Sequence, residues 1–378
     1  MDNKCLGCGA TLQTIDPKKI GYVKSDILYS EKEELLCERC FNLKHYNKTV
    51  DVFINERQFL TNTDKIKKDG GLVVNIVDIF DFEGTFIPNI RTLFPKNKIL
   101  LVCNKYDLYL KSTNPNKIRN YVREILKSHN IKVSDIIMCS ANKKSDIERL
   151  MKKIAFYSEG KNIYFFGMTN VGKSTLINGI LNYDSMSDNG KKNNITVSNM
   201  VNTTLGFIKI PIDNGTFLVD TPGIINNQQL TYYLDKNTLN YIVPKKFIKP
   251  AIYQLNRGQT VFINGFARFD FVEGEKTSFV VNVSNGLKCH RTKLENADSY
   301  YENHKDNLLL MPNPDERARL GKLVKHHYVI PQGVKKDICV SGLGYITVSS
   351  NDSDAVIDIT TFEKIKVIIR DSIVWLKN

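Results

Sequence analysis

The chain has 378 residues, of which 42% are hydrophobic and 25% are charged. That balance excludes wholesale disorder and collagen-like repeats, and the length predicts two or three domains. Lys and Arg number 53 against 40 Asp and Glu, and the resulting net charge of +13 indicates a polyanionic partner such as nucleic acid or a ribosome. An acidic-lipid surface and a merely basic surface are the alternatives that charge alone leaves open.

Two cysteine pairs stand in the N-terminal segment, Cys5 with Cys8 and Cys37 with Cys40. Four thiolates at this spacing can complete a tetrahedral Zn²⁺ site, and a redox role is the alternative. We expect residues 1–50 to form a zinc finger in which the metal is structural, because so short a segment has no sufficient core of its own. Paired cysteines also fit a reducing cytosol better than a disulfide scaffold.

The N-terminus has no apolar run that would mark a signal peptide. The longest apolar stretch, residues 71–80, is interrupted by Asn75 and Asp78 and is too short to cross a bilayer. We therefore expect a cytoplasmic chain with no membrane partner.

Residues from about 69 to 224 alternate apolar runs with helical patterns, which predicts an α/β fold with a parallel sheet. The expected helix at 145–157 opens with Ser145 and Glu148 at capping-box spacing. The other expected helices are 115–128 and 173–182. The expected strands are 71–78, 98–103, 133–139, 161–166, 206–212 and 216–220.

The C-terminal part is richer in β-type runs, among them 259–269, 278–283 and 364–369. It predicts a separate domain that is α+β or mostly β. The expected boundaries are 51–226 for the α/β domain and 227–378 for this C-terminal, partner-binding domain.

A phosphate loop is predicted by the run GMTNVGKS, which matches GxxxxGK[ST] between an apolar strand and a helix. Its backbone N–H groups and the helix dipole would hold phosphates, Lys173 would reach the β- and γ-phosphates, and the Ser174 hydroxyl would hold Mg²⁺. A chance glycine turn is the alternative. The nucleotide-binding residues expected here are Gly167, Asn170, Val171, Gly172, Lys173, Ser174 and Thr175.

Guanine recognition is predicted by the motif NKYD, which begins at Asn104. The Asp107 carboxylate can accept from guanine N1–H and N2–H₂, which adenine lacks, so it selects GTP over ATP. Asn104 would hold the loop and contact the base, and Lys105 would pack over the ring. Ser140 and Ala141, after the next strand, would offer a backbone N–H to guanine O6. A plain turn is the alternative for both motifs.

The motif DTPG, from Asp220 to Gly223, ends an apolar run. Asp220 would reach Mg²⁺ through water, and the Gly223 N–H would sense the γ-phosphate; a strand-ending turn is the alternative. Between the phosphate loop and DTPG, Thr204 is the expected Mg²⁺ ligand, with Thr203 as the alternative. The residues expected to act in catalysis are Lys173, Thr204 and Gly223.

The motif order NKxD, SA, phosphate loop, switch threonine, DxxG is that of a circularly permuted GTPase fold, because ordinary GTPases begin with the phosphate loop. DTPG then runs directly into the C-terminal domain, which suggests a lever coupled to the nucleotide state (hypothesis). Ile224 stands where Ras-like enzymes carry a water-orienting glutamine, so hydrolysis should be slow alone. The Asn170 side chain could coordinate an activating K⁺, although this position also tolerates many residues.

Taken together, the sequence resembles the YqeH family of circularly permuted GTPases. The resemblance rests on the finger, with CLGCG at Cys5 and CERCF at Cys37, on the motif order, and on the block DICVSGLGY that begins at Asp337. It implies a cytoplasmic bacterial GTPase that uses GTP, Mg²⁺ and Zn²⁺, acts in assembly of the small ribosomal subunit and binds 16S-type rRNA. One departure is Val201-Asn202 where the family has Pro-Gly.

A GTP-gated adaptor that binds a protein partner is the alternative function, and a monomer is expected for either. Lys and Arg side chains would neutralise RNA phosphates, and Tyr300 and Tyr301 could stack on bases. The candidate phosphate contacts, each of which could instead be a solvated face, are Lys245, Lys246, Lys249, Arg317, Arg319, Lys322, Lys325, His326, His327, Lys335 and Lys336.

Overall fold

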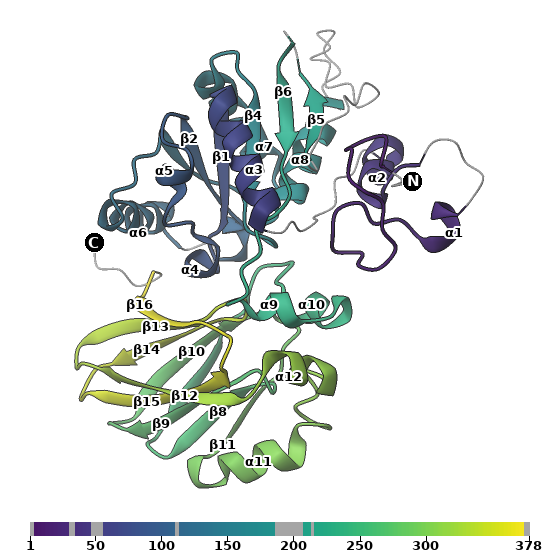
Figure 1. The fold of residues 1–378 in the computed structure, drawn as a ribbon. Helices are drawn as coiled ribbons and strands as arrows, with labels where there is room; N and C mark the ends of the chain where they lie inside the picture. Colours follow the sequence, from purple (N-terminus) through teal and green to yellow (C-terminus); the bar gives the residue numbers. More distant parts are fainter. Residues whose placement is uncertain are drawn as a thin grey trace. The chain divides into compact units, whose positions relative to one another are not determined.

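A computed structural model describes residues 4–29, 35–46, 56–109, 113–185, 207–212 and 215–373 of the chain. It divides into two compact units (Figure 1). The first unit spans Met1–Tyr106 and Val122–Ile225, and the second spans Asp107–Tyr121 and Asn226–Asn378. The boundary falls within the NKYD motif, so that Asp107 and the residues after it up to Tyr121 group with the C-terminal part of the chain.

The first unit is built on a six-stranded sheet in the order β3-β2-β1-β4-β6-β5. Central β1 pairs in parallel with β2 and, from Leu72 opposite Ile163, with β4. All of β1 is buried, as expected for a strand covered on both faces. The strands are β1 (Leu72–Asp78), β2 (Ile99–Asn104), β3 (Asp135–Met138), β4 (Ile163–Gly167), β5 (Ile208–Pro211) and β6 (Phe217–Asp220).

The sequence had predicted a parallel sheet, but one strand of the observed sheet is antiparallel. β5 pairs antiparallel to β6, with Ile208 opposite Asp220. The connection between these two strands is only a few residues long, which suits a hairpin, whereas a parallel pair needs a crossover of a dozen residues or more.

Helices cover both faces of this sheet. On one face, Leu150 of α7 and Leu176 of α8 belong to the same buried cluster as Val74 of β1. On the other, the ring of Phe166 lies edge-on to Phe94 at 4.8 Å. The helices between the cysteine segment and β5 that lie wholly in the first unit are α3 (Glu56–Asp69), α4 (Phe82–Thr85), α5 (Ile90–Leu93), α7 (Lys144–Ser158) and α8 (Lys173–Ser185). The 3₁₀ turn η1 (Tyr106–Leu108) and α6 (Pro115–Ser128) each include residues of both units.

The predicted capping box at the start of α7 is wrong. The helix begins at Lys144 with Lys143 as N-cap, which makes no side-chain capping bond, so Ser145 already lies within the first turn. Glu148 pairs with Lys152 at 2.7 Å, one turn later, and does not reach back. The Asp146 carboxylate is used elsewhere, because it accepts a 3.0 Å hydrogen bond from the Ser140 N–H.

The second unit holds two five-stranded antiparallel sheets, ordered β16-β13-β14-β10-β7 and β11-β8-β9-β15-β12. They share one core, in which Phe271 of β9 and Phe279 of β10 pack with ring centroids 5.4 Å apart. The strands are β7 (Ala251–Leu255), β8 (Gln259–Ile263), β9 (Ala267–Glu273), β10 (Thr277–Val283), β11 (Cys289–Lys293), β12 (Leu323–Ile330), β13 (Val334–Val340), β14 (Gly344–Ser350), β15 (Ala355–Phe362) and β16 (Val367–Asp371).

The second unit also contains short helices: α9 (Leu230–Tyr233), α10 (Lys236–Ile242), η5 (Leu294–Asn296), α11 (Ala297–His304) and α12 (Pro314–Leu320). α12 does begin with a capping box, formed by Asn313 and Glu316. Among the helices of the described ranges, none has the length and apolar character needed to cross a bilayer.

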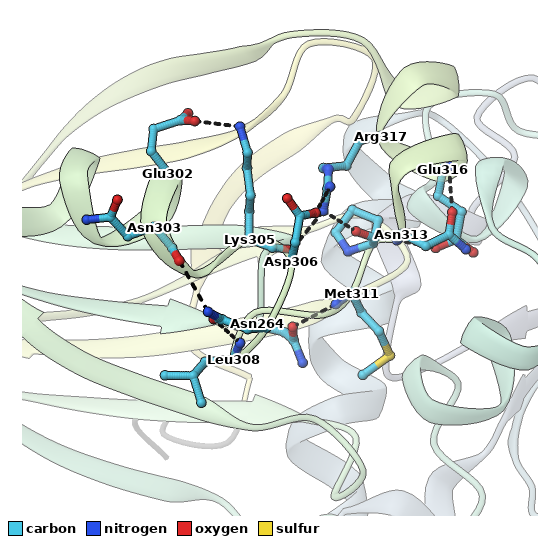
Figure 2. Close-up of polar contacts among 12 residues, drawn as sticks. Asn264, Glu302, Asn303, Lys305, Asp306, Leu308, Met311, Asn313, Glu316 and Arg317 are labelled. Atoms are coloured by element: carbon cyan, nitrogen blue, oxygen red, sulfur yellow. Dashed lines mark hydrogen bonds and ion pairs between the residues drawn. The ribbon is translucent and has the colours of Figure 1, made fainter.

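The segment between α11 and α12 is braced by side chains (Figure 2). The Asn264 Oδ1 atom accepts a 3.0 Å hydrogen bond from the Met311 N–H. Arg317 donates to the carbonyl oxygens of Lys305 at 2.8 Å and Pro312 at 2.9 Å, and it also pairs with Asp306. This loop is therefore fixed at both ends by side chains from neighbouring elements.

Candidate nucleotide site and metal centre

Three predicted motifs follow three parallel strands of the first unit, of which β4 and β6 are adjacent and β2 is separated from β4 by β1. NKYD ends β2, the phosphate loop follows β4, and DTPG follows β6. In open α/β sheets, the carboxyl ends of parallel strands meet at one edge, where ligands bind. Segments far apart in the sequence are therefore brought together at this edge.

Asn104 ties the guanine motif to the phosphate loop. Its Nδ2 atom donates a 2.9 Å hydrogen bond to the Val171 carbonyl oxygen, and its Oδ1 atom accepts a 3.2 Å bond from the Ala141 N–H. Gly172 has φ of +84°, and a Cβ there would lie 2.5 Å from Asn104 Nδ2. Only glycine fits this junction of three loops.

Lys105 bridges to Asp78, a residue that sequence reasoning did not assign to the site. Its Nζ atom lies 2.6 Å from Asp78 Oδ2 and 2.6 Å from the Asn170 carbonyl oxygen. Lys105 was expected to pack over the guanine ring, and these contacts fix its ammonium beside the phosphate loop. In the sequence Asp78 is a lone carboxylate at the end of an apolar strand, and that position alone does not identify a site residue.

The phosphate-loop lysine is buried against the DTPG aspartate. Lys173 is 1% exposed and pairs with Oδ1 of Asp220, which is 0% exposed. Burial alone would raise the pKa of Asp220, but the charges of Lys173 and Arg39 outweigh it and hold that pKa below its usual value. The carboxylate is therefore ionised and ready to serve a cation.

Arg39 is the second cation at this carboxylate, and sequence reasoning missed it as well. It belongs to α2 (Glu38–Tyr46) of the cysteine segment, whose other helix is α1 (Ser25–Leu28). Its Nη2 atom donates to Asp220 Oδ2 at 2.5 Å and to the Asp220 carbonyl oxygen at 3.2 Å. No sequence pattern pairs two residues that are 181 positions apart.

DTPG is also bound to the phosphate loop through the backbone. The Ile224 N–H donates to the Gly167 carbonyl at 3.1 Å, and the Thr169 N–H donates to the Ile224 carbonyl at 2.9 Å. Gly223, the residue directly before Ile224, is buried. The motif expected to sense the γ-phosphate is thus held directly against the loop expected to bind it.

The remaining predicted site residues have varied surroundings. Ser174 and Ser140 are buried, whereas Thr175 is exposed. Ser140 shapes its own loop, since its Oγ atom accepts a 3.2 Å bond from the Asn142 N–H. Asp107 lies in η1, directly after β2. Thr203 and Thr204 fall outside the described residues.

The four paired cysteines form a compact buried cluster in which all four Sγ atoms lie within 4.8 Å of one another. The Cys8 and Cys37 sulfur atoms are 3.7 Å apart, close to the roughly 3.8 Å spacing of thiolates around a tetrahedral Zn²⁺ with Zn–S of about 2.3 Å. A Cβ at Gly7 would lie 2.8 Å from Cys40 Sγ. The donor set and its spacing fit zinc.

Several candidate RNA contacts are already engaged within the second unit. Arg317 holds the loop of Figure 2, and Arg319 pairs with Asp235 at 2.8 Å. His327 and Lys325 both pair with Asp358, at 2.8 and 3.3 Å. We therefore assign Arg317 a structural role and keep the exposed lysines as the candidate contacts.

Comparison with known proteins identifies the family. A family model described as "50S ribosome-binding GTPase" matches residues 162–253, and one described as "YqeH-like, C-terminal" matches residues 276–373. "Uncharacterized protein YqeH" of Bacillus subtilis (strain 168) is 41% identical over 370 residues, covering 98% of this chain and 99% of that one. The chain belongs to the YqeH family of GTPases. Its P-loop GTPase fold is circularly permuted, as predicted, because NKYD at the end of β2 precedes the phosphate loop after β4 and DTPG after β6.

Other relatives are more distant. "NO-associated protein 1, chloroplastic/mitochondrial" of Arabidopsis thaliana is 26% identical and covers 91% of this YqeH-family chain and 69% of its own length. The solved structure "Crystal structure of GNP-bound YlqF from T. maritima" overlaps 44% of this chain and 57% of its own, with TM-score 0.30 and 20% identity. The family assignment therefore rests on the Bacillus relative.

Proposed function

We propose that this chain is a GTP-hydrolysing switch protein that acts in assembly of the small (30S) ribosomal subunit in the cytoplasm. The observation that carries the nucleotide part is the junction at Asn104, which joins the guanine motif to the phosphate loop at the edge where DTPG also ends. The ribosomal part is supported by the family resemblance and by the net charge of +13.

In the proposed site, Asp107 selects guanine, with Asn104, Ser140 and Ala141 shaping the base loop. The phosphates lie over the phosphate loop, and Lys173 leaves Asp220 to contact them. Ser174, Asp220 and a switch threonine hold Mg²⁺, which neutralises charge on the phosphates. Thr204 is our choice for that threonine and Thr203 the alternative.

Hydrolysis is proposed to be slow in isolation, because the aliphatic side chain of Ile224 cannot orient a water molecule. K⁺ bound at Asn170, or the ribosomal partner, would supply the missing stimulation. Asn170 already has φ of 63°, and its carbonyl oxygen accepts from Lys105. Replacing K⁺ by Na⁺ tests this point, since unchanged turnover would remove K⁺ from the proposal.

Our proposal names the small subunit, whereas the description of the matched GTPase family model refers to the 50S subunit. Our choice of the small subunit follows the whole-chain resemblance, which includes the finger and the C-terminal block.

Co-sedimentation with purified 30S and 50S subunits, in the presence of a non-hydrolysable GTP analogue, tests the choice. We expect binding to 30S that is lost at high salt and in Lys173→Ala. Equal binding without nucleotide would contradict a GTP switch, and capture by 50S alone would contradict the subunit assignment.

A further inference from the structure

The four-cysteine segment places a buried guanidinium inside the proposed nucleotide site. Arg39 stands between Cys37 and Cys40 in the sequence, and its side chain ends on the Asp220 carboxylate at 2.5 Å. Arg39 is 3% exposed and Asp220 is 0% exposed. Charged side chains are rarely buried this deeply unless they are paired, so this contact is part of the packing and not a surface encounter.

The two oxygens of Asp220 serve two different cations. Lys173 pairs with Oδ1, and Arg39 donates to Oδ2 and to the main-chain carbonyl of the same residue. When a nucleotide binds, Lys173 is expected to move to its phosphates and free Oδ1. Until a divalent cation arrives, Arg39 would still hold Oδ2, because it comes from a different element and makes two bonds to Asp220.

A divalent cation arriving at Asp220 would therefore meet a guanidinium at the same carboxylate. Like charges repel strongly at a buried site, where water screens them poorly. The divalent cation and the Arg39 side chain need the same carboxylate and repel each other, so their binding to Asp220 is negatively coupled. Each weakens the binding of the other by the same factor.

We propose that Arg39 links the zinc finger to the magnesium-nucleotide site: it occupies Asp220 in the nucleotide-free protein, and Mg²⁺ with GTP displaces it. The inference rests on the proposed function of this site. It makes Arg39 a positioning residue that reports nucleotide loading to the finger. The zinc cluster holds the base of α2, so displacement of Arg39 loosens the contact of that helix with DTPG.

The first test is the Mg²⁺ requirement for binding a fluorescent guanine nucleotide by full-length, zinc-loaded protein. Arg39→Gln should lower the Mg²⁺ concentration at half-saturation by about fivefold or more, the lower range for coupled sites. Lys44→Gln makes the same charge change on an exposed residue of α2 and should leave it unchanged. Measurement of the zinc content checks that both variants keep the finger.

The second test measures the effect of Mg²⁺ and nucleotide on the finger, by hydrogen exchange of the wild-type chain. Mg²⁺ with a non-hydrolysable GTP analogue should speed exchange in α2, and this response should be absent in Arg39→Gln. The inference about Arg39 would be overturned by an unchanged or higher Mg²⁺ requirement in Arg39→Gln, or by hydrogen exchange in α2 that does not respond to Mg²⁺ and nucleotide. Either result would leave the proposed function standing. Failure of the wild type to bind guanine nucleotide would instead overturn the proposed function together with the inference.

Discussion

The side-chain amide of Asn104 donates a 2.9 Å hydrogen bond to the carbonyl oxygen of Val171, 67 residues later in the chain. The same side chain accepts from the Ala141 N–H at 3.2 Å. One residue thereby connects the two predicted guanine loops to the phosphate loop. Strand order alone brings these loops to one edge, and this amide fixes their spacing.

Asp107→Asn should exchange guanine for xanthine specificity. Guanine offers N1–H and N2–H₂ to a carboxylate, whereas xanthine carries an oxygen at C2 that an amide N–H can meet. We expect GTP affinity to fall about 100-fold, or about 2.7 kcal/mol, with xanthosine triphosphate binding better to the variant than to the wild type. Competitive nucleotide titration measures both. A variant that keeps full GTP affinity would remove Asp107 from the base site.

Asp78→Asn should weaken nucleotide binding without unfolding the chain. The 2.6 Å ion pair with Asp78 orients the Lys105 ammonium beside the phosphate loop, and an amide would orient it less firmly. We expect about a tenfold loss of GTP affinity by calorimetry, or about 1.4 kcal/mol. The matched control is Asp64→Asn, which removes an exposed pair with Lys67. Equal affinities in both variants would make the Asp78 pair structural only.

Removal of one cluster thiolate should release the metal. Cys40→Ser should lower the zinc content from one per chain to near zero and leave α2 unfolded, because the segment depends on metal for order. Elemental analysis and circular dichroism measure the two effects. Cys289→Ser, at an isolated cysteine of β11, is the control that should retain zinc. Zinc retained in Cys40→Ser would point to a different ligand set.

Asn264→Gly should loosen the braced loop of the second unit and leave the nucleotide site intact. The variant removes the acceptor of the Met311 N–H, and glycine tolerates the φ of 46° found at this position. We expect the free energy of unfolding to fall by about 1–3 kcal/mol and exchange to quicken between residues 305 and 313. Asn303→Ala, an exposed residue of α11, should change neither. An equal effect in both would mean that the Asn264 bond is not what holds the loop.

Strong local patterns explain why so much of the first unit was predictable. The six expected strands appear within a few residues of their expected bounds because each is a short apolar run ended by a turn. α3 was missed because its sequence is largely polar, with Phe59 and Ile66 as rare apolar contacts. β5 was expected as a strand, but its antiparallel direction was missed, because strand direction depends on connection length and not on composition.

In the candidate site, too, the residues within local sequence patterns were predictable and those defined by distant partners were not. Residues that belong to contiguous motifs, such as Lys173 and Asp220, could be found from spacing alone. Asp78 and Arg39 could not, because their importance comes from partners distant in sequence. A lone carboxylate or arginine carries no signal until the fold shows what it contacts.

Pairing of β1 with β4, which begins with Leu72 opposite Ile163, has a consequence for how the protein is made. In a nascent chain, β1 and β2 leave the ribosome long before β4 is synthesised. One apolar edge of the central strand must then wait unpaired for its neighbour, and such edges invite aggregation. During that interval the growing chain would benefit from a chaperone that covers this edge.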